Sequence, residues 1–155
     1  MPITTLCLDF GNTRKKAAIF HDAEMKEGIV LPDDAVETIQ EIIRKFQPQK
    51  AILSSVVDHN PAIEELLALN TKFYKLSYQT KVSFTTPVGK PEDIGADRLA
   101  LSEAAVHFYP EKNNFVIGLG TCITYNFINK YHEFLGCLCW VPCLSTKPRI
   151  YTLVD

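Results

Sequence analysis

The first thirty residues alternate between apolar runs and short polar turns. Residues 6–10 form one apolar run and residues 17–20 form a second, and the polar stretch from Gly11 to Lys16 separates them. Two apolar runs joined by a Gly-Asn turn predict a strand–turn–strand hairpin. Residues 21–30 alternate more weakly and predict a third strand at the edge of the sheet.

A helical period follows the three strands. Asp34 and Glu37 have the spacing of a capping box, in which side chains satisfy the free N–H groups at the start of a helix. Apolar residues then recur at helical spacing as far as Pro48: Ala35, Val36, Ile39, Ile42, Ile43 and Phe46. This pattern predicts an amphipathic helix with one buried face.

The first half ends with strand, helix and strand patterns. Residues 50–57 are a continuous apolar run, as in a buried parallel strand. A helix is predicted from Asn60, its N-cap, to Leu69, and a further strand over 72–77. Three strands followed by helix, strand, helix and strand predict an α/β lobe over residues 1–78, with the hairpin at one edge of a mixed sheet.

The second half repeats the opening pattern. Residues 79–94 contain prolines and glycines without a sustained period, and we interpret them as an ordered crossing between lobes. A helix is predicted over 95–109, ending before a proline. Residues 115–128 again form an apolar strand, a Gly-Thr turn and a strand. A second lobe is therefore predicted over 95–136, followed by an atypical tail over 137–155.

The first hairpin carries candidate phosphate-binding chemistry. Asp9 could face a hydrated Mg²⁺, Gly11 lets the backbone approach a ligand, Thr13 could donate to phosphate and Lys16 could balance charge. The alternative is an ordinary hairpin, because strand–Gly-Asn–strand patterns also occur without a ligand.

Composition and charge narrow the class of protein to which the chain can belong. The chain has 155 residues, 46% hydrophobic and 22% charged, and a formal net charge of -2. These values favour a globular protein and argue against nucleic acid as the main partner. No apolar run reaches membrane-spanning length, the start lacks a signal-peptide pattern, and the five cysteines favour reduced thiols. We therefore expect a cytoplasmic protein without a membrane partner.

Three motifs together resemble the type III pantothenate kinase family, part of the acetate and sugar kinase, Hsp70 and actin superfamily. They are D-x-G-N-T-x-x-K at Asp9 to Lys16, G-A-D-R at Gly95 to Arg98, and the Gly-Thr stretch from Gly120 to Thr124. The SSVV sequence at 54–57 fits the same pattern, and the resemblance covers residues 3–136. It implies a duplicated actin-like ATPase fold, related to ribonuclease H, with an incomplete second lobe.

The resemblance also implies a reaction and its residues. The reaction is ATP-dependent phosphorylation of pantothenate to 4'-phosphopantothenate, the first step of coenzyme A synthesis. Nucleotide and its Mg²⁺ would be held by Asp9, Phe10, Gly11, Asn12, Thr13, Arg14, Lys15, Lys16 and Thr121. Pantothenate would be held by Val88, Gly95, Ala96, Asp97 and Arg98.

Within the implied pantothenate site, Asp97 would accept the proton and Arg98 would anchor polar groups. An alternative is that Asp97 only favours the helix N-terminus through the dipole. The family resemblance further implies a homodimer and a monovalent cation, K⁺ or NH₄⁺.

The chain departs from the family pattern at four places. Gly118 stands at the monovalent-cation position, where the family has an aspartate, so the ligand is lost. Asn126 replaces a second family aspartate, and Val88 stands where a tyrosine is expected. The tail after Gly136 matches nothing in the pattern, as a reading-frame change would produce.

Several alternatives stay open. The chain could be a non-catalytic nucleotide-binding or regulatory relative, such as a transcriptional accessory factor, or a truncated inactive fragment. A sugar or acetate kinase would leave the GADR motif unexplained. Cys137, Cys139 and Cys143, with His132, could form a metal site, although their spacing is unlike common zinc motifs. We also expect residues 115–134 to expose an apolar face.

Overall fold

The computed structural model describes residues 2–86, 91–140 and 150–152. The chain divides into two compact units, Met1–Leu76 and Ser77–Asp155, which we call unit 1 and unit 2. In the described part of the chain, no helix is both long enough and apolar enough to span a membrane. Each unit is described by itself below.

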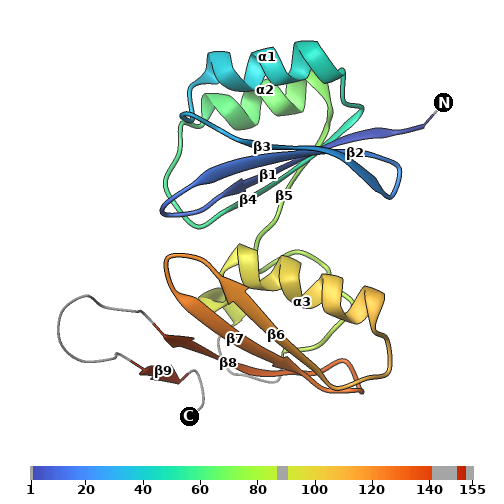
Figure 1. The fold of residues 1–155 in the computed structure, drawn as a ribbon, viewed down its shortest axis with the longest axis vertical. Helices are drawn as coiled ribbons and strands as arrows, with labels where there is room; N and C mark the ends of the chain where they lie inside the picture. The colour runs from blue at the N-terminus through green and yellow to red at the C-terminus, as the bar shows by residue number, and fades with distance from the viewer. Residues whose placement is uncertain (1, 87–90, 141–149, 153–155) are drawn as a thin grey trace. The chain divides into compact units, whose positions relative to one another are not determined.

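Unit 1 is a five-stranded mixed sheet with two helices on one face (Figure 1). Its elements are β1 (Thr4–Phe10), β2 (Lys15–His21), β3 (Glu24–Val30), α1 (Val36–Phe46), β4 (Lys50–Ser55), α2 (Ala62–Asn70) and β5 (Lys72–Lys75). The strand order is β3-β2-β1-β4-β5, in which β1–β4 and β4–β5 are parallel pairs. The predicted element order and the edge position of the third strand are confirmed.

The predicted edge position of the hairpin is wrong, because β1 is the central strand of the sheet. Leu6, Leu8 and Phe10 alternate along β1 and are almost completely buried in the core of unit 1. The buried stripe of α1, with Ile39 and Ile43, belongs to the same core. A strand with such a buried face is stabilised by neighbours on both sides, and the parallel strand β4 supplies the second one.

The predicted capping box at the start of α1 is also wrong. Asp34 pairs with Lys15 at 3.0 Å, and this hydrogen bond holds the pKa of Asp34 below its usual value. Asp33 organises the first turn instead, because its Oδ1 accepts from the Ala35 amide at 3.0 Å and from the Thr38 hydroxyl at 2.7 Å. Asp34, the expected cap residue, is therefore paired with the Lys15 ammonium group and does not cap the helix.

Unit 2 contains a four-stranded antiparallel sheet and one long helix (Figure 1). Its elements are the 3₁₀ turn η1 (Pro91–Asp93), α3 (Ala96–Phe108), β6 (Asn114–Leu119), β7 (Ile123–Ile128), β8 (Phe134–Trp140) and β9 (Ile150–Thr152), and the strand order is β6-β7-β8-β9. The predicted helix and repeated hairpin are confirmed. Together with unit 1 they confirm a mixed α/β fold with two helix-flanked sheets.

The residues before α3 pack within unit 2. Phe84 is buried against Phe134, with ring centroids 6.1 Å apart. The amide and hydroxyl of Ser83 donate to the Glu103 carboxylate of α3 at 2.8 and 2.7 Å. These contacts fix residues 83 and 84 within unit 2; the role of residues 79–94 as a crossing between lobes stays a prediction. Val88 lies outside the described residues.

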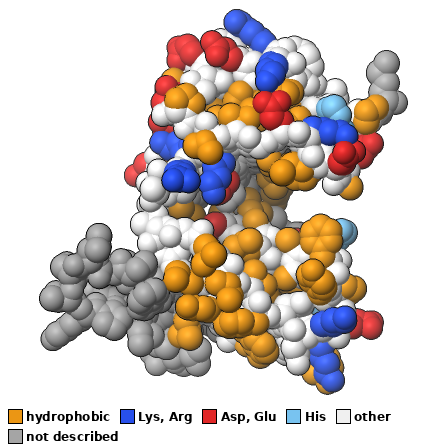
Figure 2. All heavy atoms as spheres, in the orientation of Figure 1, with side chains coloured by type: hydrophobic (Ala, Val, Ile, Leu, Met, Phe, Trp, Pro, Cys, Tyr) orange, Lys and Arg blue, Asp and Glu red, His pale blue; other side chains and the backbone are white. Residues whose placement is uncertain are grey.

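The two faces of the unit 2 sheet differ in what covers them. Ile128 and Phe134 are buried with Leu99 and Val106 of α3, so α3 covers one face. The opposite face, here called the outer face, carries Phe115, Ile117 and Leu119 of β6, Tyr125 and Phe127 of β7, and Leu138 of β8. Ile117 is 50% exposed and Leu119 is 80% exposed. The expected apolar surface is therefore confirmed, and Figure 2 shows hydrophobic side chains gathered over this part of unit 2.

We expect the outer face to cause self-association. Ile117→Lys places a charge in its middle and should lower the concentration-dependent association of the chain in sedimentation velocity. Phe108→Lys is the matched control, because Phe108 is 70% exposed on α3, away from the outer face. A wild-type chain that stays monomeric at all concentrations, with a sharp cooperative melt, would contradict the expectation.

Candidate functional site

The hairpin β1–β2 ends in a closed polar turn. The Gly11 amide donates to the Arg14 carbonyl at 3.1 Å, which closes the turn between the two strands. A Cβ added at Gly11 would lie 3.2 Å from that carbonyl oxygen, so a side chain fits only if the turn gives way. Asn12, Thr13 and Arg14 are exposed. The turn therefore presents polar side chains and backbone to solvent, as a phosphate-binding loop requires.

One row of polar residues crosses the sheet beside this turn. Asp9 of β1 is in register with Lys16 of β2 and with Ser54 of β4. Residues paired in register point to the same face of a sheet, which here is the face opposite Leu8 and Phe10. The structure thus brings a carboxylate, an ammonium group and a hydroxyl together at the carboxyl end of β1.

The donor set of this row is compatible with a divalent metal. Mg²⁺ prefers oxygen ligands and usually keeps several waters, so an exposed carboxylate such as Asp9 can hold it through water. Ser54 adds a hydroxyl whose oxygen is buried and has no hydrogen-bond partner among the described residues. Ser54 was not singled out in the sequence as a site residue, and only its place in SSVV after the apolar run could have indicated it.

The three basic residues of the hairpin have different surroundings. Lys15 is in register with Phe10 and forms the ion pair with Asp34. Lys16 lies on the face of Asp9, and both Lys16 and Arg14 are exposed. Lys16 is therefore better placed than Lys15 to act beside Asp9.

The first turn of α3 contains the second group of candidate residues. Gly95 is the N-cap and Ala96 is the first helical residue, and Ala96 is buried. A Cβ at Gly95 would lie 2.6 Å from Oδ1 of Asp97, so the absence of a side chain at position 95 makes room for this carboxylate. The Arg98 amide donates to the Gly95 carbonyl at 3.0 Å.

The Arg98 side chain has partners within unit 2. Its Nη1 donates to Sγ of Cys137 at 2.7 Å and its Nη2 donates to the Asp93 carbonyl at 3.2 Å. These contacts orient the guanidinium group at the start of α3. Whether it also anchors a substrate stays a prediction.

Gly118 has no side chain to act as a ligand, and the structure leaves no room for one. A Cβ there would lie 2.5 Å from Oγ1 of Thr124 and 3.2 Å from Cδ1 of Leu101. Thr124 therefore fills the space in which a side chain at position 118 would begin, so position 118 offers no side-chain ligand to a monovalent cation. Thr124 ends the third sequence motif, but its contact with Gly118 could not be predicted, because only the strand register brings the two residues together.

We predict that Gly118→Ala destabilises the chain by about 1–3 kcal/mol because Thr124 and Leu101 resist the added methyl group. Gly28→Ala is the matched control, since a Cβ at Gly28 meets no atom within 4 Å. Denaturant unfolding of both variants tests this, and adding Thr124→Ala to Gly118→Ala should recover part of the loss. Equal stability of Gly118→Ala and the wild type would contradict the prediction.

Asn126 and the second hairpin turn complete the candidate residues. The Asn126 side chain is fully buried, and its Nδ2 donates to the Val116 carbonyl at 3.3 Å. A neutral amide suits this position better than an aspartate, because burying an unpaired charge is costly.

In the second turn the Gly120 amide donates to the Cys122 carbonyl at 3.1 Å, and Thr121 is exposed beside it. The two hairpins thus share a glycine whose amide closes the turn.

The alternative metal site finds no support among the described residues, which contain no cluster of three or more His, Cys, Asp or Glu side chains placed to hold a metal. Cys137 is buried, whereas the side chain of Cys139 and all of Cys143 lie outside the description. The reading-frame hypothesis concerns the same tail and stays a prediction.

Two helix-flanked sheets, each containing a hairpin closed by a glycine amide, make the chain a mixed α/β protein with a repeated hairpin. A narrower assignment comes from comparison with known proteins. The family model described as type III pantothenate kinase matches residues 5–140. The chain belongs to the type III pantothenate kinase family.

Curated relatives agree with this assignment. The chain is 35% identical over 133 residues to the type III pantothenate kinase of Christiangramia forsetii, covering 84% of this chain and 55% of the relative. It is 31% identical over 132 residues to that of Bacteroides fragilis, covering 84% and 54%. The chain thus spans about half the length of the curated relatives it matches.

Solved structures show only slight likeness. The chain is similar to YeaZ from Pseudomonas aeruginosa with a TM-score of 0.37 and 10% identity, over 96% of this chain and 67% of that one. It is similar to an Aquifex aeolicus member of the Ppx/GppA family with a TM-score of 0.39 and 16% identity, over 98% and 51%. The family assignment does not rest on these two structures.

Proposed function

We propose that the chain binds ATP with a divalent metal and transfers the γ-phosphoryl group to pantothenate. Membership of the type III pantothenate kinase family supports this proposal. The structural observation that carries it is the row of Asp9, Lys16 and Ser54 beside the glycine-closed turn. Cytoplasmic location and a homodimer are part of the same proposal, by resemblance to the family.

The hairpin would position the nucleotide. Amides and hydroxyls of the turn, with Thr13 exposed on it, would donate to phosphate oxygens, and Lys16 would offset their charge. Asp9 would hold Mg²⁺ through water, and the ion would neutralise charge that develops on the transferring group. Arg14 and Thr121 are exposed polar residues of the two turns and are proposed to contact phosphate as well.

Asp97 would act on the acceptor. Its carboxylate, with room beside Gly95, would accept a hydrogen bond from the primary hydroxyl of pantothenate and orient it for attack. Phosphoryl transfer depends mainly on positioning and charge neutralisation, so the carboxylate does not have to be a strong base. The hydroxyl proton passes to the carboxylate as the new O–P bond forms and the ADP oxygen leaves.

The experiment is ATP consumption by the purified chain with and without pantothenate, in Mg²⁺. ADP formation that requires pantothenate supports the proposal. A folded chain that binds ATP but forms no ADP with pantothenate would refute the kinase. Because position 118 has no side-chain ligand for a cation, we expect the same rate in K⁺ and in Na⁺.

A second candidate function is a nucleotide-binding regulatory relative without catalysis. The specific observation in its favour is that Thr124 occupies the space beside Gly118. This candidate keeps the hairpin as a nucleotide site and predicts that ATP binds without turnover.

A further inference from the structure

A histidine outside the candidate site lies against the base of the phosphate hairpin. His59 is in the loop between β4 and α2, and its side chain is only 6% exposed. Its ring meets the Phe10 ring edge to face, with centroids 5.5 Å apart. Phe10 is the last residue of β1 and immediately precedes Gly11, whose amide closes the turn.

The loop that carries His59 is fixed to the same end of β1. The Val56 amide donates to the Phe10 carbonyl at 3.1 Å, and Ser55 is in register with Phe10. Nδ1 of His59 lies 3.2 Å from the Ser55 hydroxyl and 3.3 Å from the Val57 carbonyl. The ring therefore joins the loop and the end of β1 through both polar and aromatic contacts.

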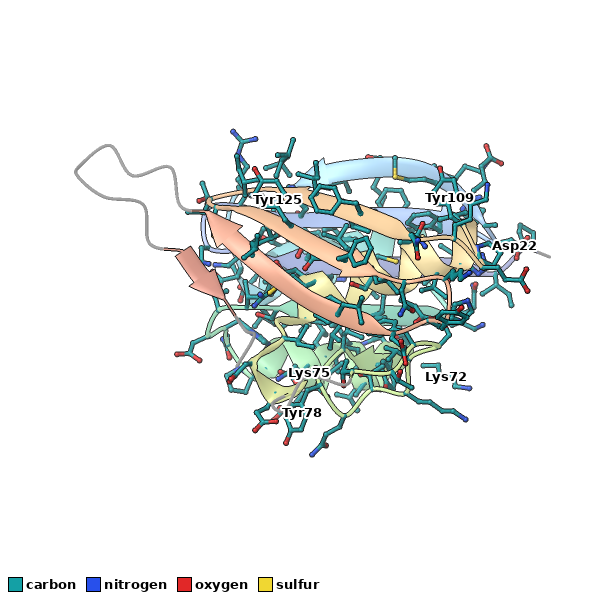
Figure 3. The ribbon with its side chains drawn as sticks, turned by 90° about the horizontal axis from the view of Figure 1, so that it is seen from below. Asp22, Lys72, Lys75, Tyr78, Tyr109 and Tyr125 are labelled. Carbon is teal, nitrogen blue, oxygen red and sulfur yellow. The ribbon has the colours of Figure 1, made fainter. Side chains whose placement is uncertain are left out.

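The other side of the ring is held by a carboxylate. Nε2 of His59 donates to Oε1 of Glu64 in α2 at 2.9 Å, and Nζ of Lys75 in β5 reaches the same oxygen at 2.6 Å (Lys75 is labelled in Figure 3). Partial burial raises the pKa of Glu64, but the hydrogen bonds from Lys75 and His59 outweigh burial and leave the pKa below its usual value. Glu64 is thus a carboxylate at neutral pH.

These contacts give the ring two ways to bond. The Ser55 hydroxyl donates to the Val57 carbonyl at 2.8 Å, and with a proton on Nε2 alone it can turn to donate to Nδ1 instead. With both nitrogens protonated, Nδ1 donates to the Val57 carbonyl or to the Ser55 oxygen. The charged groups that face His59 are Glu64 of α2 directly and Lys75 of β5 through Glu64, whereas β1 and β4 present Phe10 and Ser55. Asp58, the neighbour in the loop, is exposed.

We infer that His59 is a positioning residue for the phosphate hairpin: held by Glu64 and Ser55, its ring fixes Phe10 and through it the turn that begins at Gly11. This inference rests on the proposed function, because the proposed function names ATP as the ligand of the turn. A residue with this role transmits its own bonding state to the turn, so the environment of the Gly11 amide changes when His59 gains a proton.

The test follows the Gly11 amide and the His59 ring by NMR in a pH titration of the intact ¹⁵N-labelled chain. The two signals should change with the same midpoint, and His59→Gln should remove the transition at Gly11. His107→Gln is the matched control, since His107 is an exposed histidine that also meets a phenylalanine edge to face, at 5.0 Å. A Gly11 signal that does not follow His59, or that keeps its transition in His59→Gln, overturns the inference.

A second variant covers the case in which His59→Gln does not fold. Glu64→Gln keeps the ring and its contact with Phe10 but removes the carboxylate charge. The pH midpoints of the His59 and Gly11 signals should then shift by the same amount. A shift of the His59 midpoint with an unchanged Gly11 midpoint overturns the inference.

Nucleotide affinity separates this inference from the proposed function. The pH dependence of ATP affinity should differ from that of His59→Gln by about fivefold across the His59 transition, because the turn that holds the phosphates follows the bonding state of the ring. ATP binding with identical pH profiles in the wild type and His59→Gln overturns the inference and leaves the proposed function standing. No ATP binding at any pH, with Gly11 still following His59, refutes the proposed function but supports the positioning of the turn.

Discussion

Asp97→Asn is expected to lower pantothenate-dependent ATP turnover by about 10²- to 10⁴-fold, the range typical for loss of a positioned proton acceptor. Asparagine keeps the shape of the side chain beside Gly95 but cannot take up the hydroxyl proton. Steady-state ADP formation at saturating ATP and pantothenate measures the effect. ATP affinity should stay within about twofold, because Asp97 is proposed to act on the acceptor and not on the nucleotide.

Asp93→Asn is the matched control for Asp97→Asn. Asp93 is an exposed carboxylate in η1, four residues earlier, and its backbone carbonyl, which accepts from Arg98, is unchanged by the substitution. It should retain turnover within about twofold. Equal turnover in Asp97→Asn and Asp93→Asn would remove Asp97 from the proposed mechanism and leave it as a residue that favours the helix N-terminus.

Asp9→Asn is expected to weaken ATP binding in Mg²⁺ by about 10- to 100-fold, as expected when a buried or ligand-facing charged contact is lost. The amide cannot supply the negative charge that the hydrated ion needs, and Lys16 loses its register partner of opposite charge. Isothermal titration calorimetry with and without Mg²⁺ measures the effect. The loss should be smaller without the metal, because Asp9 is proposed to act through it.

Asp22→Asn controls for the general loss of one carboxylate from unit 1. Asp22 is exposed in the turn between β2 and β3, and its Oδ1 accepts from the Ile3 amide at 2.9 Å, which an asparagine can also do. Asparagine also tolerates the positive φ of 52° at this position. A loss of affinity that is the same in Asp22→Asn, or the same with and without Mg²⁺, would contradict a metal-holding role for Asp9.

Much of unit 1 could be predicted because its local signals and its packing agree. Apolar residues recur at helical spacing along α1 and at every second position along β1, so each pattern fits one kind of secondary structure. Asn60 was predicted as a cap, and its Oδ1 accepts from the Ala62 amide at 3.0 Å, although α2 begins two residues later. Such signals are local and are therefore visible in sequence.

The features that could not be predicted depend on neighbours distant in sequence. The sequence places Asp34 in a capping box, but in the structure its carboxylate pairs with Lys15 of β2. β1 is central because it pairs in parallel with β4, and this pairing cannot be predicted from a local sequence pattern. Ser54 and Thr124 become relevant only through the register that sets them beside Asp9 and Gly118.

The candidate site divides in the same way. Asp9, Gly11 and Lys16 are close in sequence, so a motif could predict that they meet at one turn. Arg98 was also singled out, but its contact with Cys137 joins residues 39 positions apart and could not be foreseen. His59 carried no motif, and its importance depends on the fold that brings it to Phe10.

The most direct test of the central claim is an ATP titration of the ¹⁵N-labelled chain in Mg²⁺, observed by NMR. The account predicts that the amides of Gly11, Asn12 and Thr13 shift first and saturate together, and that Asp9→Asn weakens this response. Saturable ATP binding that leaves the Gly11 to Arg14 turn unchanged would contradict the claim that this hairpin is the nucleotide site.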